Sequence, residues 1–293
     1  MGRSKGPGRS TQPKQKWRKI LYGNREYPDN YTDSSFLQEM RKNVHIYHVS
    51  FHEAFLGAGR VTNALCIVVL FCVVFAYLYK QSLDPYTVFV YNCAGTAMGY
   101  LWYRCQTIFE DGYWNYFLRD MRMVVIFLAV GFALSPILKT LTETISTDTI
   151  YAMTVFMMFI HLVFKDYGVS AGIVSSSLSF NAAIFGSICL ASRLASSFHA
   201  FVLLSLSVEA FVLLPVLMVK LGQSVTLLVL IISVTITALW SLSSSMTVFF
   251  ILFICFVNVV CPFWFLKWQV YKENIYGPWD EATVEDADNI CLE

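Results

Sequence analysis

The feature that most limits the fold of this chain is a run without any charged residue from Leu221 to Phe265. A membrane-spanning helix needs about 20 predominantly apolar residues, so this run is too long for one span and fits two. The segment SLSSSM at 241–246 supplies a polar turn between them. The run therefore indicates a membrane protein that contains at least one pair of spanning helices.

The composition extends this conclusion to the whole chain, which is 56% hydrophobic and only 14% charged. Soluble domains carry about 25% charged residues. We predict an all-α polytopic membrane protein with about eight transmembrane helices, although six or seven spans remain open. The expected spans are 61–80, 86–103, 121–138, 149–165, 171–191, 199–219, 224–242 and 246–266. They form a transmembrane bundle over 61–266, between an N-terminal tail (1–60) and a C-terminal tail (267–293).

Two segments outside the spans have the pattern of helices that lie on a membrane surface. Ser35 and Gln38 are spaced as a capping box, and apolar residues follow at near-helical intervals, which predicts an amphipathic helix over 35–56. The connection 104–122 mixes charged and aromatic residues, which suits a second interfacial helix.

The distribution of Lys and Arg predicts the orientation of the chain. With eight spans, one side carries 18 of the 21 basic residues, eleven of them in the first 60 residues, and the other side carries only Lys80, Lys139 and Arg193. Both termini are therefore expected in the cytosol.

Several polar residues stand out against the apolar spans. The segment SPILKTLTETISTDTIY (135–151) contains Lys139, Glu143 and Asp148, for which we predict a capped, ion-paired hairpin on the non-cytosolic side. Glu209 lies in the middle of a span, where a charge is costly. A hydrogen-bonded packing role for it is favoured over a proton relay, because no other acid or base lies mid-span. Further structural or lipid-contact candidates are Lys165 and Asp166.

Small residues recur in two spans at intervals that allow helices to approach closely. One set is Gly95 and Gly99. The other is the stripe Ala171, Ser175, Ser179, Ala183, Ser187 and Ala191.

The chain carries none of the motifs expected of a nucleotide-binding or hydrolytic enzyme. It has no glycine-rich phosphate loop and no Gly-x-Ser-x-Gly elbow, and either tail is too short for a nucleotide-binding domain. A net charge of +1 argues against a nucleic-acid partner. His45, His48 and His52 share a helical face, but a wet face beside the bilayer is favoured over a metal site. We expect no cofactor, no metal and no catalytic residue in this chain.

Long strings of the sequence resemble the PIG-C family, whose members are subunits of the phosphatidylinositol N-acetylglucosaminyltransferase complex. The resemblance runs from Trp17 to Ala282 and is most specific in two regions, 135–194 and 272–282. The strings that carry it are SPILKTLTETISTDTIYAM (135–153), HLVFKDYG (161–168), IVSSSLSFNAAIFGSICLASRL (173–194), KENIYGPWDEA (272–282) and the segment 17–31 with its PDNY.

The resemblance implies a location in the endoplasmic reticulum membrane. It also implies a part in the transfer of GlcNAc from UDP-GlcNAc to phosphatidylinositol, the first step of GPI-anchor biosynthesis. The transferase fold belongs to another subunit, PIG-A, and the further partners are PIG-H, PIG-P, PIG-Q and PIG-Y. The family has no assigned catalytic residues, so we expect a non-catalytic scaffold that helps to present the lipid.

Partner docking is expected on the cytosolic segments 17–31, 35–56, 104–122 and 272–282. Aromatic side chains dominate interface energetics, which makes Trp17, Tyr22, Pro278 and Trp279 the candidate anchors. A membrane transporter or lipid scramblase is the alternative, suggested by Glu209 with Pro215 and Pro262. A membrane enzyme acting alone is a third hypothesis.

Overall fold

A computed structural model describes most of the chain, and it divides the chain into two units. One unit is 50–266, and the other combines the two tails, 1–49 and 267–293. The described residues are 27–28, 30–31, 41–43, 48–104, 113–140, 144–168, 174–222, 224–273 and 275–276.

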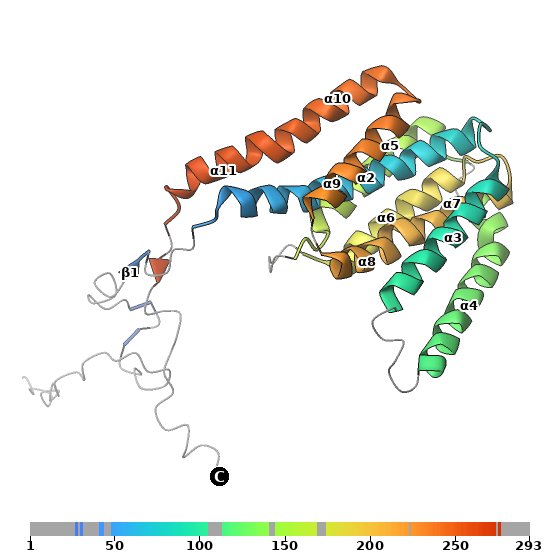
Figure 1. The fold of residues 1–293 in the computed structure, drawn as a ribbon, viewed down its shortest axis with the longest axis horizontal. Helices are drawn as coiled ribbons and strands as arrows, with labels where there is room; N and C mark the ends of the chain where they lie inside the picture. Colours follow the sequence, from blue (N-terminus) through green and yellow to red (C-terminus); the bar gives the residue numbers. More distant parts are fainter. Residues whose placement is uncertain are drawn as a thin grey trace, which may run out of the picture. The chain divides into compact units, whose positions relative to one another are not determined.

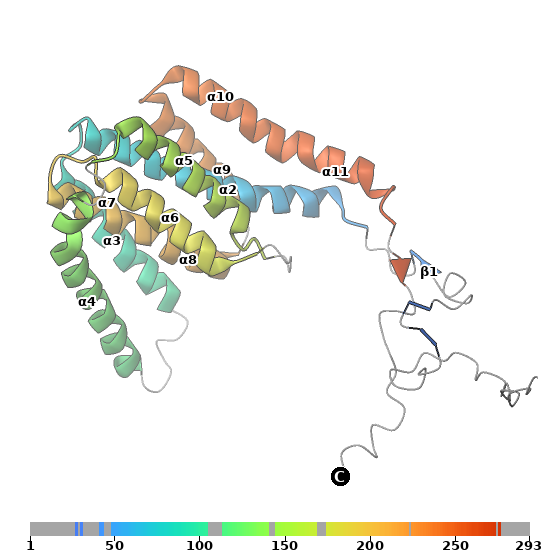
Figure 2. The ribbon, with the colours of Figure 1, turned by 180° about the vertical axis from the view of Figure 1, so that it is seen from behind.

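Helices make up almost all of the unit 50–266 (Figures 1 and 2). α3 and α4 lie on one side of this unit and α10 lies on the opposite side. The order is α2 (Phe51–Tyr79), α3 (Pro85–Arg104), α4 (Tyr113–Thr140), α5 (Thr147–Phe164), α6 (Ser176–Ala191), α7 (Ser197–Val208), η1 (Glu209–Leu213), α8 (Leu214–Leu221), α9 (Val225–Trp240), α10 (Ser244–Cys255), η2 (Phe256–Val260) and α11 (Cys261–Gln269).

The prediction of an all-α polytopic membrane protein is confirmed. In the described residues, five helices are long and apolar enough to cross a membrane: α2, α4, α5, the continuous helix Ser197–Leu221 and the continuous helix Ser244–Gln269. α6 and α9 are apolar but have only 16 residues each. α3 has 20 residues but is less hydrophobic than the five. These eight helical segments correspond one to one to the eight predicted spans.

The predicted amphipathic helix over 35–56 is wrong in its central part. Arg41–Lys42 form a short strand, β1, and among the described residues that follow, 48–50 are not helical and α2 begins at Phe51. The start of α2 has a clear local cause, because Ser50 and Glu53 form the capping box: the Ser50 hydroxyl accepts from the Glu53 N–H, and the Glu53 carboxylate accepts from the Ser50 N–H. Residues 35–38 lie outside the described part.

The predicted interfacial helix over 104–122 also differs from the structure. Residues 113–122 are the first turns of α4, which continues into the span without a break, and residues 105–112 lie outside the described part. The Asp120 carboxylate joins the ends of α3 and α4 by accepting from the Arg104 guanidinium at 2.5 Å and from the Tyr100 hydroxyl at 3.0 Å. The charged residues of this segment therefore pair two helices.

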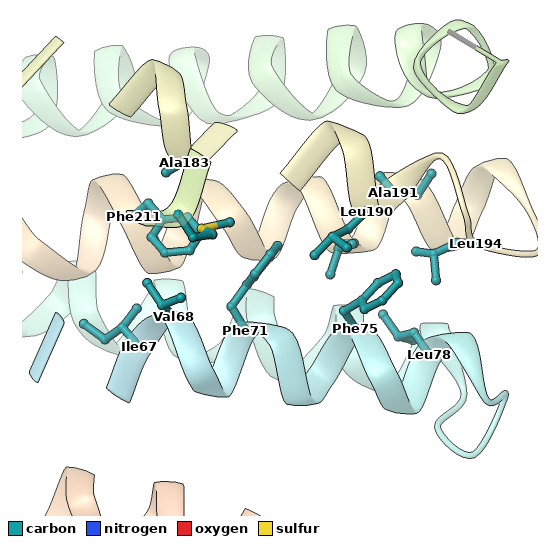
Figure 3. Close-up of a cluster of buried hydrophobic side chains, with 13 residues drawn as sticks. Ile67, Val68, Phe71, Phe75, Leu78, Ala183, Leu190, Ala191, Leu194 and Phe211 are labelled. Atoms are coloured by element: carbon teal, nitrogen blue, oxygen red, sulfur yellow. The ribbon is translucent and has the colours of Figure 1, made fainter. Parts of the chain in front are cut away.

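The centre of the bundle is an apolar cluster between α2, α6 and η1 (Figure 3). Phe71 of α2 meets Phe211 of η1 edge to face, with ring centroids 5.2 Å apart. The small residues of α6 let α5 approach it closely: a Cβ on Gly186 would lie 3.2 Å from Met158 Cε. Ser179, Ala183, Ser187 and Ala191 are all buried, so the predicted role of the small stripe in helix packing is confirmed for these four residues.

Two spans contain a π-helical turn, and each turn is followed by a proline two residues later. η1 precedes Pro215 and η2 precedes Pro262. A proline lacks the N–H for a helical bond and its ring clashes with the carbonyl four residues earlier, and a wider turn relieves both problems. Both spans nevertheless run on as continuous helices.

The described residues of the tail unit come from both ends of the chain. β1 pairs with β2 (Ile275–Tyr276) in antiparallel register, with Arg41 opposite Tyr276. The Gln269 side chain accepts from the Val49 N–H at 3.1 Å and lies 3.1 Å from His48 Nδ1. The segment before α2 is therefore hydrogen-bonded to the end of α11 and to the strand that follows it.

Candidate functional site

The polar side chains of the spans are the candidates for a functional site, because each one needs a hydrogen-bond partner in an apolar environment. In the described residues several serine and threonine hydroxyls bond to carbonyls of their own helix, and a few polar side chains form separate pairs between helices.

Glu209 lies at the centre of the helix Ser197–Leu221 and faces α3. With its amide oriented to satisfy both of its ends, Asn92 donates to the Glu209 carboxylate and accepts from the Leu206 N–H at 3.1 Å. The Thr96 hydroxyl also bonds to the carboxylate. Gly95 makes this approach possible, because a Cβ there would lie only 2.8 Å from Glu209 Oε1. The hydrogen-bonded packing role favoured from the sequence agrees with these contacts.

His161 is fully buried within the spans, with 1% of its surface exposed. Its Nδ1 lies 3.0 Å from the Ser179 carbonyl oxygen and 2.9 Å from Ser179 Oγ. The Ser179 hydroxyl donates to the His161 carbonyl at 3.0 Å, so Nδ1 carries the proton and donates to α6. Among the described residues Nε2 has no hydrogen-bond partner, and the ring meets Phe211 edge to face. This pair joins α5, α6 and η1.

A tight turn at the end of α5 contains the predicted candidates Lys165 and Asp166. The Asp166 carboxylate accepts from the Gly168 N–H at 2.7 Å, and Gly168 has a φ of +80°, which favours glycine. Arg60 of α2 donates to the Tyr167 carbonyl at 2.7 Å. Lys165 is half-buried, and burial lowers its pKa to about 8. The turn is therefore fixed to α2.

The polar segment 135–151 contacts the connection between α6 and α7. Lys139 donates to the Ala195 carbonyl at 2.8 Å, Ser135 donates to the Ser197 carbonyl, and Arg193 donates to the Ile145 carbonyl at 2.7 Å. Ser146 caps α5 by accepting from the Thr149 N–H, which confirms the capped part of the predicted hairpin.

The ion-paired part of that hairpin finds no support in the described residues. Lys139 binds a backbone carbonyl, and no salt bridge joins it to Asp148 in the part of the chain that the structure describes. Glu143 lies outside that part. So do Trp17, Tyr22, Pro278 and Trp279, the predicted partner-binding residues, and His45 of the histidine set.

One further pair was not predicted from the sequence. The Asn258 side chain in η2 donates to the Thr62 hydroxyl of α2 at 2.7 Å and to the Ile254 carbonyl at 3.0 Å. The available signal was an amide inside an otherwise apolar run, and the same signal marks Asn92.

Two observations limit the chemistry that these side chains can support. The described residues contain no group of three His, Cys, Asp or Glu side chains that could hold a metal ion. An open pocket of about 580 Å³ lies on the surface of the bundle between α2, α9 and α10. Its lining is apolar apart from one serine: Leu65, Val69, Leu239, Ser245, Met246, Phe249, Phe250 and Phe253. Such a lining suits a hydrocarbon chain better than a charged substrate.

Comparisons with known proteins identify relatives along almost the whole chain. A family model described as phosphatidylinositol N-acetylglucosaminyltransferase, GPI2, matches residues 17–280. The chain is 40% identical to a human phosphatidylinositol N-acetylglucosaminyltransferase subunit over 280 residues, covering 92% of this chain and 94% of the relative. The GPI2 subunit of Schizosaccharomyces pombe is 33% identical, with 92% and 87% covered. No solved structure matches the chain.

Proposed function

Because the chain belongs to the GPI2 family of phosphatidylinositol N-acetylglucosaminyltransferase subunits, we propose that it is the non-catalytic membrane subunit of such a complex. The complex transfers GlcNAc from UDP-GlcNAc to phosphatidylinositol at the cytosolic face of the endoplasmic reticulum, the first step of GPI-anchor biosynthesis. In this proposal both termini are cytosolic, and the chain seats the transferase subunit, PIG-A, together with PIG-H, PIG-P, PIG-Q and PIG-Y.

The observation that carries the scaffold role is that three polar side chains in the described spans are bound to polar residues of a neighbouring helix. Glu209 is bonded to Asn92, His161 to Ser179 and Asn258 to Thr62. Polar groups that are hydrogen-bonded to each other in this way stabilise helix packing. The three pairs lie at three separate helix interfaces. A glycosyl transfer site would instead bring acidic or basic groups together at one open pocket.

The apolar pocket between α2, α9 and α10 supports an additional role in lipid presentation. Phosphatidylinositol carries two acyl chains, and a groove within the spans can hold a chain while the headgroup stays at the membrane surface. Substituting Phe249 with Trp would fill part of the pocket. We expect less phosphatidylinositol to copurify with this variant, while the other subunits remain bound.

The proposed function is tested in cells that lack the endogenous subunit. Expression of the tagged chain should restore GlcNAc transfer to phosphatidylinositol, and the transferase subunit should copurify with it. The purified chain alone should not turn over UDP-GlcNAc. Turnover by the chain alone, or purification without any transferase subunit, would contradict the proposal. Substrate flux through the purified chain in liposomes would favour a transporter or scramblase instead.

A further inference from the structure

Glu209 is only half-buried within this chain, although it lies at the centre of a span. Its contacts come from α3, where Asn92 and Thr96 are donors and Gly95 provides the space. Cys93 is close enough to interact electrostatically with the carboxylate, and Cys93 is exposed. One side of this polar group therefore opens onto the surface of the bundle.

The surface around this opening belongs to α3. α3 is less hydrophobic than the five strongest spans, and Asn92 is its only buried residue. Cys93, next to Asn92, and Met98, on the other flank of α3 and further along it, are both exposed, and Met98 is 71% exposed. The half-buried Glu209 needs cover from another polar group, because acyl chains offer no hydrogen-bond donor.

We infer that the outward face of α3 beside Glu209 is the binding surface for a membrane-spanning helix of another subunit, which presents a hydrogen-bond donor at mid-membrane depth. This inference rests on the proposed function, which places the chain in a complex. The carboxylate of Glu209 argues against a second copy of this chain as the partner. A second copy of this chain would bring a second carboxylate to the same place, while Asn92 and Thr96 already donate to their own Glu209.

Site-specific photocrosslinking of the assembled complex tests the surface directly. A photoreactive residue in place of Met98 should give an adduct with another subunit of the complex, mapped by mass spectrometry to a spanning helix. The matched control is Phe249, which is 73% exposed on α10 and lines the apolar pocket. Adducts at position 98 with lipid alone, with a second copy of the chain, or at the same yield as at position 249 would overturn the inference.

A pair of substitutions tests the hydrogen-bond donor. Glu209→Leu leaves the donor of the partner unpaired, whereas Glu209→Gln keeps an acceptor oxygen at the same place. We expect Glu209→Leu to lower the amount of copurifying partner by about tenfold and Glu209→Gln to lower it far less. Helical content and thermal unfolding of each purified variant identify any loss of fold.

The outcomes separate this inference from the function on which it rests. If the wild-type chain copurifies with no transferase subunit, the proposed function fails. If the wild-type chain and a folded Glu209→Leu variant recover the same subunits in equal amounts, the function stands and the docking surface is wrong. If Glu209→Leu does not fold, the photocrosslink at position 98 still decides between a protein neighbour and lipid.

Discussion

At the scale of single residues, the bundle depends on a few polar side chains that the surrounding residues are shaped to accept. A charged group at the centre of a span costs about 2.5–3.5 kcal/mol on insertion scales. Two donors on α3 offset part of this cost for Glu209, and they reach it because Gly95 has no side chain. The absence of a Cβ at this position is thus as important as the donors.

Gly95→Ala tests the close approach of α3 to η1. The new methyl group would lie 2.8 Å from Glu209 Oε1, so the carboxylate must move away from Asn92 and Thr96. We expect a loss of about 1–2 kcal/mol in the free energy of unfolding, measured with the purified chain in micelles. The control is Gly57→Ala in α2, where a Cβ meets nothing within 4 Å and alanine favours the helix. Equal effects at the two positions would contradict the close contact.

Lys165 gives the chain a defined dependence on pH. Burial lowers its pKa from 10.5 to about 8 in the folded state, so between these values the unfolded chain holds a proton that the folded chain has released. Stability therefore rises with pH across this window, and the full penalty of the buried charge remains below pH 8. Tyr167, whose pKa burial raises to about 12, stays protonated there.

Lys165→Met removes the penalty and isolates it from other titrating groups. The variant should be more stable than the wild type by about 2 kcal/mol at pH 7, and this difference should shrink as pH rises towards 10.5. Unfolding curves of both proteins at several pH values measure the difference. A difference that stays constant from pH 7 to pH 10 would show that the lysine is charged in both states throughout.

At the scale of helices, the two π-helical turns explain the presence of a proline in each of two spans. Pro215 and Pro262 suggested broken helices of the kind found in transporters. In the structure both spans continue, and each wide turn places a polar side chain, Glu209 or Asn258, against a neighbouring helix. The prolines therefore mark sites of helix contact.

A double-mutant cycle measures the contact made by η2. Asn258→Leu and Thr62→Val each remove one side of the 2.7 Å hydrogen bond between η2 and α2 at nearly constant volume. We expect a coupling energy of about 0.6 kcal/mol, the usual size for such bonds within a membrane. Unfolding of the two single variants and the double variant gives this energy. Strictly additive losses would show that the bond does not connect the two helices.

The sequence predicted the helices well because length and hydropathy decide which segments span a membrane. It predicted their ends less well: the first span was predicted from residue 61, whereas α2 begins at Phe51, with Ser50 and Glu53 as its capping box. The pairing of polar groups could not be predicted from the sequence, because Asn92 and Glu209 are far apart in the chain and meet only through helix packing. A lone Lys139 likewise suggested an ion pair, whereas its partner is the carbonyl of Ala195.

At the scale of the whole unit 50–266, three hydrogen bonds join the end of α4 and the loop after it to the α6–α7 loop and the start of α7. They come from Ser135, Lys139 and Arg193, and all three acceptors are backbone carbonyls. The α6–α7 loop leads directly into the helix that contains Glu209. The loops thus fix how α4 and α5 stand against the helices that carry the proposed partner surface.

Removing these bonds should therefore harm assembly of the complex more than sugar transfer itself. In the variant Lys139→Met with Arg193→Met, we expect several-fold less transferase subunit to copurify, because each lost bond to a charged donor is worth about 1.5–3 kcal/mol. The transfer rate per assembled complex should stay unchanged. The matched control is Lys80→Met, which removes a basic residue from the preceding loop at the same end of the bundle. Full assembly together with lost transfer would show instead that Lys139 or Arg193 takes part in the reaction.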